Sequence, residues 1–175
     1  MSLSFPQTPR LVTERLVLRV PVAGDFDVFA AYFMSERARY TGGQPDRILA
    51  WQRFCVTLGH WVFRGYGVFV IEWQGRAIGA AGPYFPEGWP EPELAWQIWD
   101  ARAEGQGLAQ EAALATRAHV YDTLGWETAV SLIAPDNGRS ATLAQRLGCH
   151  LESIHDHPHY GPLQVWRHPR RADLA

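Results

Sequence analysis

The sequence lacks lysine, since all 16 residues of its combined lysine and arginine count are arginine. Pyridoxal enzymes hold their cofactor through a lysine Schiff base, and a Walker-type P-loop places a lysine on the nucleotide phosphates. The missing lysine therefore excludes both of these enzyme classes.

Cysteine is scarce as well: Cys55 and Cys149 are far apart and show no CxxC spacing. Both have apolar neighbours, so we expect two buried thiols in a reducing compartment. No apolar run approaches the ~20 residues that a membrane span needs, and residues 1–6 lack the basic and apolar segments of a secretion signal. We therefore expect a cytoplasmic protein with no membrane partner.

Excess positive charge is also missing, because the formal net charge is -2. A nucleic-acid-binding surface carries a basic field, so we expect no nucleic-acid partner. The 175 residues include 47% hydrophobic residues, and no repeat or linker interrupts them. Length and composition predict one domain over residues 1–175.

The hydrophobic patterns predict a mixed order of strands and helices. The expected elements are, in chain order, a strand at 16–20, helices capped by Asp25 and Asp46, hairpin strands at 68–73 and 76–81, a proline-rich loop at 83–92, a strand at 93–99, a helix at 108–124, a strand at 129–133, a helix at 139–147 and a strand at 163–166. Asn137 and Gly148 are suited to start and stop the last helix.

A glycine-rich turn stands where the strand at 93–99 hands over to the long helix, with the sequence Glu104-Gly105-Gln106-Gly107-Leu108-Ala109. Small residues let backbone N–H groups approach a ligand, and a helix N-terminus attracts anions. Such a turn can hold a pyrophosphate without a cationic side chain. Two glycines before a helix can equally be a plain structural turn.

The turn resembles the acetyl-CoA motif of the GNAT acetyltransferases, which has the form Gln/Arg-x-x-Gly-x-Gly/Ala. Gly107 and Ala109 match it, and Glu104 takes the first position in place of Gln or Arg. Residues 137–140 and 143–148 are similar to the family's Asn-x-x-Ser...Leu-Gly-Phe stretch near the pantetheine arm. Residues 13–19 look like the opening of the branch with the ribosomal-protein N-terminal acetyltransferases.

The resemblance covers about residues 13–167 and implies the GNAT fold, an α/β domain with a twisted, mixed and mainly antiparallel sheet flanked by helices. It implies acetyl-CoA as co-substrate, held by Glu104 to Ala109 and by Asn137, whose alternative role is to cap its helix. Arg139 and Arg146 are candidates for the CoA phosphates, or else solvated surface residues. The backbone N–H of Ile98 or Trp99 is the candidate donor to the acyl oxygen.

For catalysis, the resemblance places a carboxylate base at Glu93, with Glu91 and Glu152 as substitutes; a solvated glutamate is the alternative. Many members of the family protonate the leaving thiolate with a tyrosine, whose position here is Ala144. Ser140 is the natural replacement, and it could otherwise be a simple hydroxyl of the first helical turn. A thiolate of pKa near 8.5 needs no strong acid.

Histidines and aromatic residues gather near the expected acceptor side. His155, His157 and His159 alternate like metal ligands, but a turn around Pro158 is a poor frame for zinc, and we expect no metal. His155 or His157 could instead contact the substrate. A loop cluster could line an acceptor pocket, although each member is individually more typical of a core: Tyr84, Phe85, Trp89 and Trp96.

These features predict an N-acetyltransferase that transfers the acetyl group to a primary amine by direct attack. The acceptor is open among a protein N-terminus, an amino acid, a polyamine and an aminoglycoside, and a homodimer fits the same prediction. The alternatives are a non-catalytic acyl-CoA-sensing module and, from the histidine cluster, a metal-dependent hydrolase.

Overall fold

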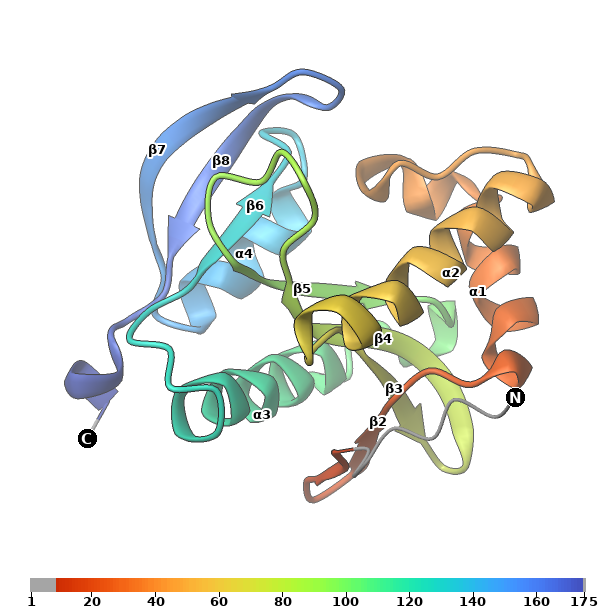
Figure 1. The fold of residues 1–175 in the computed structure, drawn as a ribbon, viewed down its shortest axis with the longest axis horizontal. Coiled ribbons are helices and arrows are strands. Elements are labelled where there is room, and N and C mark those ends of the chain that lie inside the picture. Colours follow the sequence, from red (N-terminus) through yellow and green to blue (C-terminus); the bar gives the residue numbers. More distant parts are fainter. Residues whose placement is uncertain (1–8, 175) are drawn as a thin grey trace.

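The computed structural model describes residues 9–174, which form a single sheet of eight strands with helices on both faces (Figure 1). The strands are β1 (Leu11–Val12), β2 (Leu16–Arg19), β3 (Phe69–Trp73), β4 (Arg76–Tyr84), β5 (Glu93–Ile98), β6 (Val130–Ile133), β7 (His150–His157) and β8 (Gly161–Arg167). Their spatial order is β1-β2-β3-β4-β5-β6-β8-β7, and all neighbours are antiparallel except β5 and β6. The expected mixed, mainly antiparallel sheet is confirmed.

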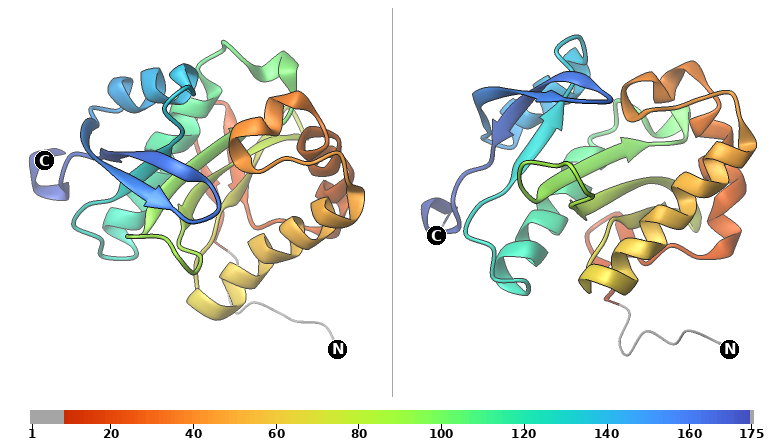
Figure 2. Two further views of the ribbon diagram at one scale, coloured as in Figure 1. Left: turned by 90° about the horizontal axis from the view of Figure 1, so that it is seen from above. Right: turned by 45° about the horizontal axis from the view of Figure 1, so that its top comes forward.

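Four α-helices and four short 3-10 helices complete the described residues: α1 (Phe26–Phe33), α2 (Arg47–Arg64), α3 (Leu108–Asp122), α4 (Gly138–Arg146), η1 (Ala23–Asp25), η2 (Glu36–Thr41), η3 (Ala101–Ala103) and η4 (Arg171–Leu174). Figure 2 shows α1 and α2 on one side of the sheet and α3 and α4 on the other. None of the helices described here is long and apolar enough to cross a membrane. Residues 1–6, considered above for a secretion signal, lie outside residues 9–174.

Side chains that alternate along the strands fill a core on each face of the sheet. Val70 packs with α1 and α2, whereas Phe69 and Ile71 pack against Leu108 and Ala112 at the start of α3. This second contact fixes the N-terminus of α3 against the sheet, and with it the position of the glycine turn.

The parallel pair β5 and β6 is joined at one register position, Glu93 opposite Val130. Beyond it the two strands diverge toward their carboxyl ends, as Figure 1 shows. The glycine turn and α3 follow β5, and α4 follows β6. Both helix N-termini therefore lie at the open end of the divergence, where ligands commonly bind in sheets of this kind.

Several local predictions are wrong. Cys55 is exposed rather than buried, whereas Cys149 is buried as expected. Cys55 follows the buried Phe54 directly, so it points about 100° away around α2. Asp46 caps α2 as predicted, but the Asp25 side chain does not cap α1. It is buried, accepts two hydrogen bonds from the Arg19 guanidinium, each 2.8 Å long, and accepts a third from the Val22 N–H at the start of η1.

The hairpin around Gln74-Gly75 is confirmed, but β4 continues through Pro83 to Tyr84, which the sequence placed in a loop. Strand β7 was not among the expected strands, and the sequence suggested only a mobile turn at Pro158 and Gly161-Pro162. It is an edge strand whose apolar side chains Leu151 and Ile154 are exposed, so its sequence lacks a buried apolar face.

Candidate active site

The glycine turn is a rigid support for the N-terminus of α3. Gly105 and Gly107 have φ angles of +74° and +75°, a left-handed conformation that side chains disfavour. A Cβ on Gly105 would meet nothing within 4 Å, so the turn presents its backbone to open space. Arg15 anchors it from outside through the Gln106 carbonyl and the Glu111 carboxylate. The first N–H groups of α3 have no hydrogen-bond partner within the helix and can donate hydrogen bonds to a bound anion.

Glu104 lies between two arginines. Its carboxylate accepts a hydrogen bond from Arg37 of η2 and another, 2.8 Å long, from Arg139 at the start of α4. Arg37 also donates to the carbonyls of Ile98 (2.9 Å) and Trp99. The network therefore brings Arg139 to the glycine turn. Arg37 was not predicted as a site residue, because it belongs to no motif and is 67 residues away from Glu104 in the chain.

The backbone of β5 distinguishes the two expected donors. The N–H of Trp99 donates to the Ile78 carbonyl at 2.7 Å, so it is already used in the sheet. In an antiparallel ladder successive N–H groups alternate between the two sides. Ile98 therefore directs its N–H away from β4, toward the gap between β5 and β6, and the expectation for Trp99 is wrong.

Helix α4 presents two polar residues to the same opening. Asn137 caps the helix, since its Oδ1 accepts a hydrogen bond from the Ser140 N–H at 3.3 Å. The Ser140 hydroxyl accepts from the indole N–H of Trp96 on β5, also at 3.3 Å, which links the two sides of the opening. Arg146 lies at the other end of α4, about 12 Å along its axis, so the structure does not group it with these residues.

A cavity of about 480 Å³ runs along this opening and contains Glu93, Asn137 and Ser140 in its wall. Its other walls come from α1, η2, α2, β4, the β4–β5 loop, β5 and the turn between β7 and β8. Their aromatic members are Phe29, Phe33, Tyr40, Tyr84, Trp89, Trp96 and Tyr160. Of the expected aromatic cluster only Phe85 is missing; its ring lies under Arg64 instead.

Glu93 is the buried carboxylate of this cavity, with 6% of its surface exposed. Its two oxygens accept hydrogen bonds from the Trp89 indole N–H (2.8 Å) and the Leu132 N–H (3.1 Å). Burial raises the pKa of Glu93 to about 7, although these two hydrogen bonds act in the opposite direction. The site thus holds a carboxyl group that changes charge near neutral pH.

The substitutes for Glu93 do not line the cavity. Glu91 and Glu152 are both bound by Arg167, in each case with a shortest distance of 2.7 Å. The Arg167 hydrogen bond also lowers the pKa of Glu152. Both groups are therefore tied up in ion pairs, and Glu93 is the base that the geometry favours.

The histidines at the end of β7 and in the turn that follows it do not line the cavity. His157 is buried, and its Nδ1 accepts hydrogen bonds from the N–H groups of His159 and Tyr160. Its ring packs on the Trp89 ring in a T-shaped arrangement, with 4.9 Å between the ring centroids. The cavity wall includes Tyr160 but not His155, His157 or His159. Among residues 9–174, no three His, Cys, Asp or Glu side chains are placed to share a metal ion.

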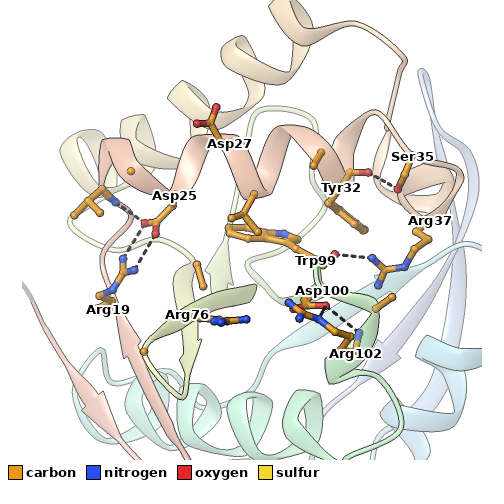
Figure 3. A pocket seen from close by; sticks show the side chains of 17 residues that line it. Arg19, Asp25, Asp27, Tyr32, Ser35, Arg37, Arg76, Trp99, Asp100 and Arg102 are labelled. Atoms are coloured by element: carbon orange, nitrogen blue, oxygen red, sulfur yellow. Dashed lines mark hydrogen bonds and ion pairs between the residues drawn. The ribbon is translucent and has the colours of Figure 1, made fainter.

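A second hollow of about 860 Å³ lies between α1, the β3–β4 turn and residues 99–102 (Figure 3). Its arginines are largely engaged, as the dashed lines in Figure 3 show: Arg19 binds Asp25, Arg102 binds Asp100 and Arg37 binds the Trp99 carbonyl. The glycine turn, Glu93 and Ser140 do not border it. The narrower cavity is therefore the candidate active site.

Comparisons with known proteins show the family and the fold. Residues 15–150 match the family model of the acetyltransferase (GNAT) domain. An acetyltransferase from Agrobacterium tumefaciens has a similar structure, with a TM-score of 0.85 and 35% identity over 97% of this chain and 98% of that chain. Among curated protein sequences, none matches the chain.

Two more distant structures have the same fold. The ribosomal-protein α-N-acetyltransferase RimL, in complex with coenzyme A, is 16% identical over 94% of this chain and 100% of that one, with a TM-score of 0.75. The aminoglycoside acetyltransferase AAC(6')-Ib, in complex with ribostamycin and coenzyme A, is 15% identical over 92% and 96% of the two chains, with a TM-score of 0.78.

Proposed function

The chain belongs to the GNAT acetyltransferase family, and we propose that it transfers the acetyl group of acetyl-CoA to a primary amine by direct attack in a ternary complex. As a member of this family it is an acyltransferase. The proposal concerns the acceptor, the mechanism and the residues that carry it. Its cytoplasmic location is part of the proposal and rests on the sequence.

The observation that carries the proposal is the buried Glu93 carboxyl in the wall of the cavity between β5 and α4. An amine acceptor is an ammonium ion at neutral pH and must lose a proton before it can attack. A base whose pKa is about 7 can take that proton near the working pH. A carboxylate in ordinary solvent would be a weaker base.

The residues present fit acetyl-CoA. The left-handed glycines and the N–H groups at the start of α3 suit the pyrophosphate, and Arg139 lies beside them on Glu104. Asn137 and Ser140 line the path toward Glu93, where the pantetheine arm would run. The thioester would lie between the Ile98 N–H and the Ser140 hydroxyl.

In the reaction, the amine nitrogen forms a bond to the thioester carbon, and the carbon–sulfur bond breaks. Glu93 accepts the proton that the amine gives up through bridging water, because five strand residues, about 16 Å, separate Glu93 from Ile98. The Ile98 N–H stabilises the negative charge on the acyl oxygen. Ser140 donates a hydrogen bond to the departing thiolate, which takes up a proton to leave as free CoA.

The test is an amine panel with acetyl-CoA, in which the release of free thiol is measured. The panel contains peptides with free N-termini and small amines, since RimL acts on a protein N-terminus and AAC(6')-Ib on an aminoglycoside. We expect at least one amine to be acetylated, and Glu93→Gln to lower turnover by roughly 10²-fold while CoA binding by calorimetry is unchanged.

Glu87→Gln serves as the matched control, because it removes a charge from an exposed position in the loop that precedes Glu93. Binding of CoA without transfer to any amine would instead support the sensing module. Full activity of the Glu93→Gln variant would show that the base is another residue.

A further inference from the structure

Two cations, Arg39 and Arg53, line the active-site cavity, and neither has a charged partner among residues 9–174. Arg39 is exposed to solvent and lies over the Tyr40 ring, so Arg53 is the one that the protein partly buries. Arg53 of α2 is partly buried, donates a hydrogen bond to the Tyr160 hydroxyl and lies 5.9 Å from the centre of the Tyr160 ring. Within residues 9–174, no carboxylate comes within 4.0 Å of its guanidinium nitrogens. Its remaining N–H donors are available to a ligand.

Other partly or fully buried arginines are compensated. Arg19, Arg37 and Arg167 each bind at least one carboxylate. Arg117 binds the Leu147 carbonyl at the end of α4, where the helix dipole is negative. A guanidinium in an aromatic cavity loses hydration, and this loss is costly unless an anion replaces the water. The position of Arg53 is therefore that of a ligand contact.

Two rings join Arg53 to the base. The Trp89 indole N–H donates a hydrogen bond to Glu93, and the Trp89 ring packs on the Tyr160 ring in a T-shaped arrangement with 5.7 Å between the ring centroids. Tyr160 in turn accepts the hydrogen bond from Arg53. Glu93 and Arg53 thus lie at the two ends of an aromatic wall, and an acceptor whose amine is at Glu93 can extend along the rings toward Arg53.

We propose that the acceptor is a small primary amine that also carries a carboxylate, with an apolar or aromatic body between the two groups. The inference rests on the proposed function and adds its substrate class. Arg53 forms a charge-assisted, bidentate ion pair with the carboxylate, while the rings pack on the body of the acceptor. A diamine would place its second ammonium against the guanidinium and is disfavoured.

Three acceptors with one benzene ring test this inference: 4-(aminomethyl)benzoate, 4-(aminomethyl)benzamide and 1,4-bis(aminomethyl)benzene. They carry the same reacting amine and differ in the group at the far end. A hydrogen bond to a charged group contributes about 1.5–3 kcal/mol, which corresponds to a preference of about 10- to 100-fold. We expect kcat/KM to follow that order, with the carboxylate best and the diamine worst.

The Arg53→Gln variant should lose about 10-fold or more in kcat/KM for the benzoate and change little for the benzamide. Arg64→Gln is the matched control, because Arg64 is also on α2 and lies over an aromatic ring, but outside the cavity. It should preserve the preference. Equal rates for benzoate and benzamide in the parent, or an unchanged ratio in Arg53→Gln, would overturn the inference.

Binding of the same three compounds, measured by tryptophan fluorescence in the presence of CoA, separates this inference from the proposed function. Preferential, Arg53-dependent binding of the benzoate without acetyl transfer would support the carboxylate site and contradict the enzyme mechanism. Acetyl transfer to amines without any preference for the benzoate would support the enzyme mechanism and contradict the carboxylate site.

Discussion

Replacing Glu93 by glutamine tests the buried base through stability as well as through catalysis. The folded protein raises the pKa of this carboxyl from 4.5 to about 7. Between these values the unfolded chain has released the proton that the folded chain still holds, so stability falls as the pH rises. One pKa unit corresponds to about 1.4 kcal/mol, so ionised Glu93 costs about 3 kcal/mol of stability above pH 7.

Glutamine removes this cost but also removes one acceptor. The carboxylate accepts the Trp89 and Leu132 N–H groups on separate oxygens, and the amide nitrogen of glutamine has to face one of them. An unsatisfied buried donor costs about 1–3 kcal/mol at every pH. The sign of the stability change at a single pH is therefore not diagnostic, whereas its pH dependence is.

The assay is urea denaturation of parent and Glu93→Gln at pH 5 and pH 8.5. We expect the variant to gain about 2–3 kcal/mol relative to the parent between these two values. The kcat/KM of the parent should rise with an apparent pKa near 7, and the variant should lack this step. A stability difference that does not change with pH would refute the buried, uncharged carboxyl and with it the tuned base.

Three further predictions concern the surrounding structure. Gly107→Val should weaken CoA binding at least ten-fold in calorimetry, whereas Gly125→Val, with the same left-handed strain but outside the site, should only lower stability by about 1–2 kcal/mol; equal CoA affinities would contradict the turn's role. Ser140→Ala should lower kcat with little effect on the CoA dissociation constant, and an unchanged kcat would remove Ser140 from the reaction. Asp25→Asn should cost about 2–3 kcal/mol in denaturation, because it leaves the Arg19 guanidinium with one fewer anionic partner in a largely buried pair; an unchanged unfolding midpoint would contradict this.

The sequence predicted the elements whose signals are local. A hairpin turn, a helix cap and a glycine turn depend on a few neighbouring residues, so β3, the start of β4, the start of α2 and the start of α3 were predicted close to their observed bounds. Edge strand β7 was missed because it lacks a buried apolar face. Its signal comes from pairing with β8, which a linear pattern does not contain.

The candidate site likewise contains residues that the sequence predicted and residues that it did not. Glu93, Asn137 and Ser140 stand at motif positions, and the structure brings them into one cavity. Arg53 and Tyr160 were not singled out, because they are 107 residues apart and meet only where the Arg53 side chain reaches the turn between β7 and β8. The residues that we propose to select the acceptor therefore come from elements whose placement only the tertiary structure provides.

Glu104 shows how a departure from a family pattern can be compensated by such long-range contacts. The negative charge of a glutamate at this position repels a pyrophosphate, whereas the family's glutamine or arginine does not. In the structure the Glu104 carboxylate binds Arg37 and Arg139, so one negative and two positive groups lie beside the glycine turn and their net charge is positive. Arg37 also ties the end of β5 to η2 through the Ile98 carbonyl. The net positive charge that a single arginine would supply is thus distributed over three elements, which makes the geometry of the turn depend on the packing of η2 and α4.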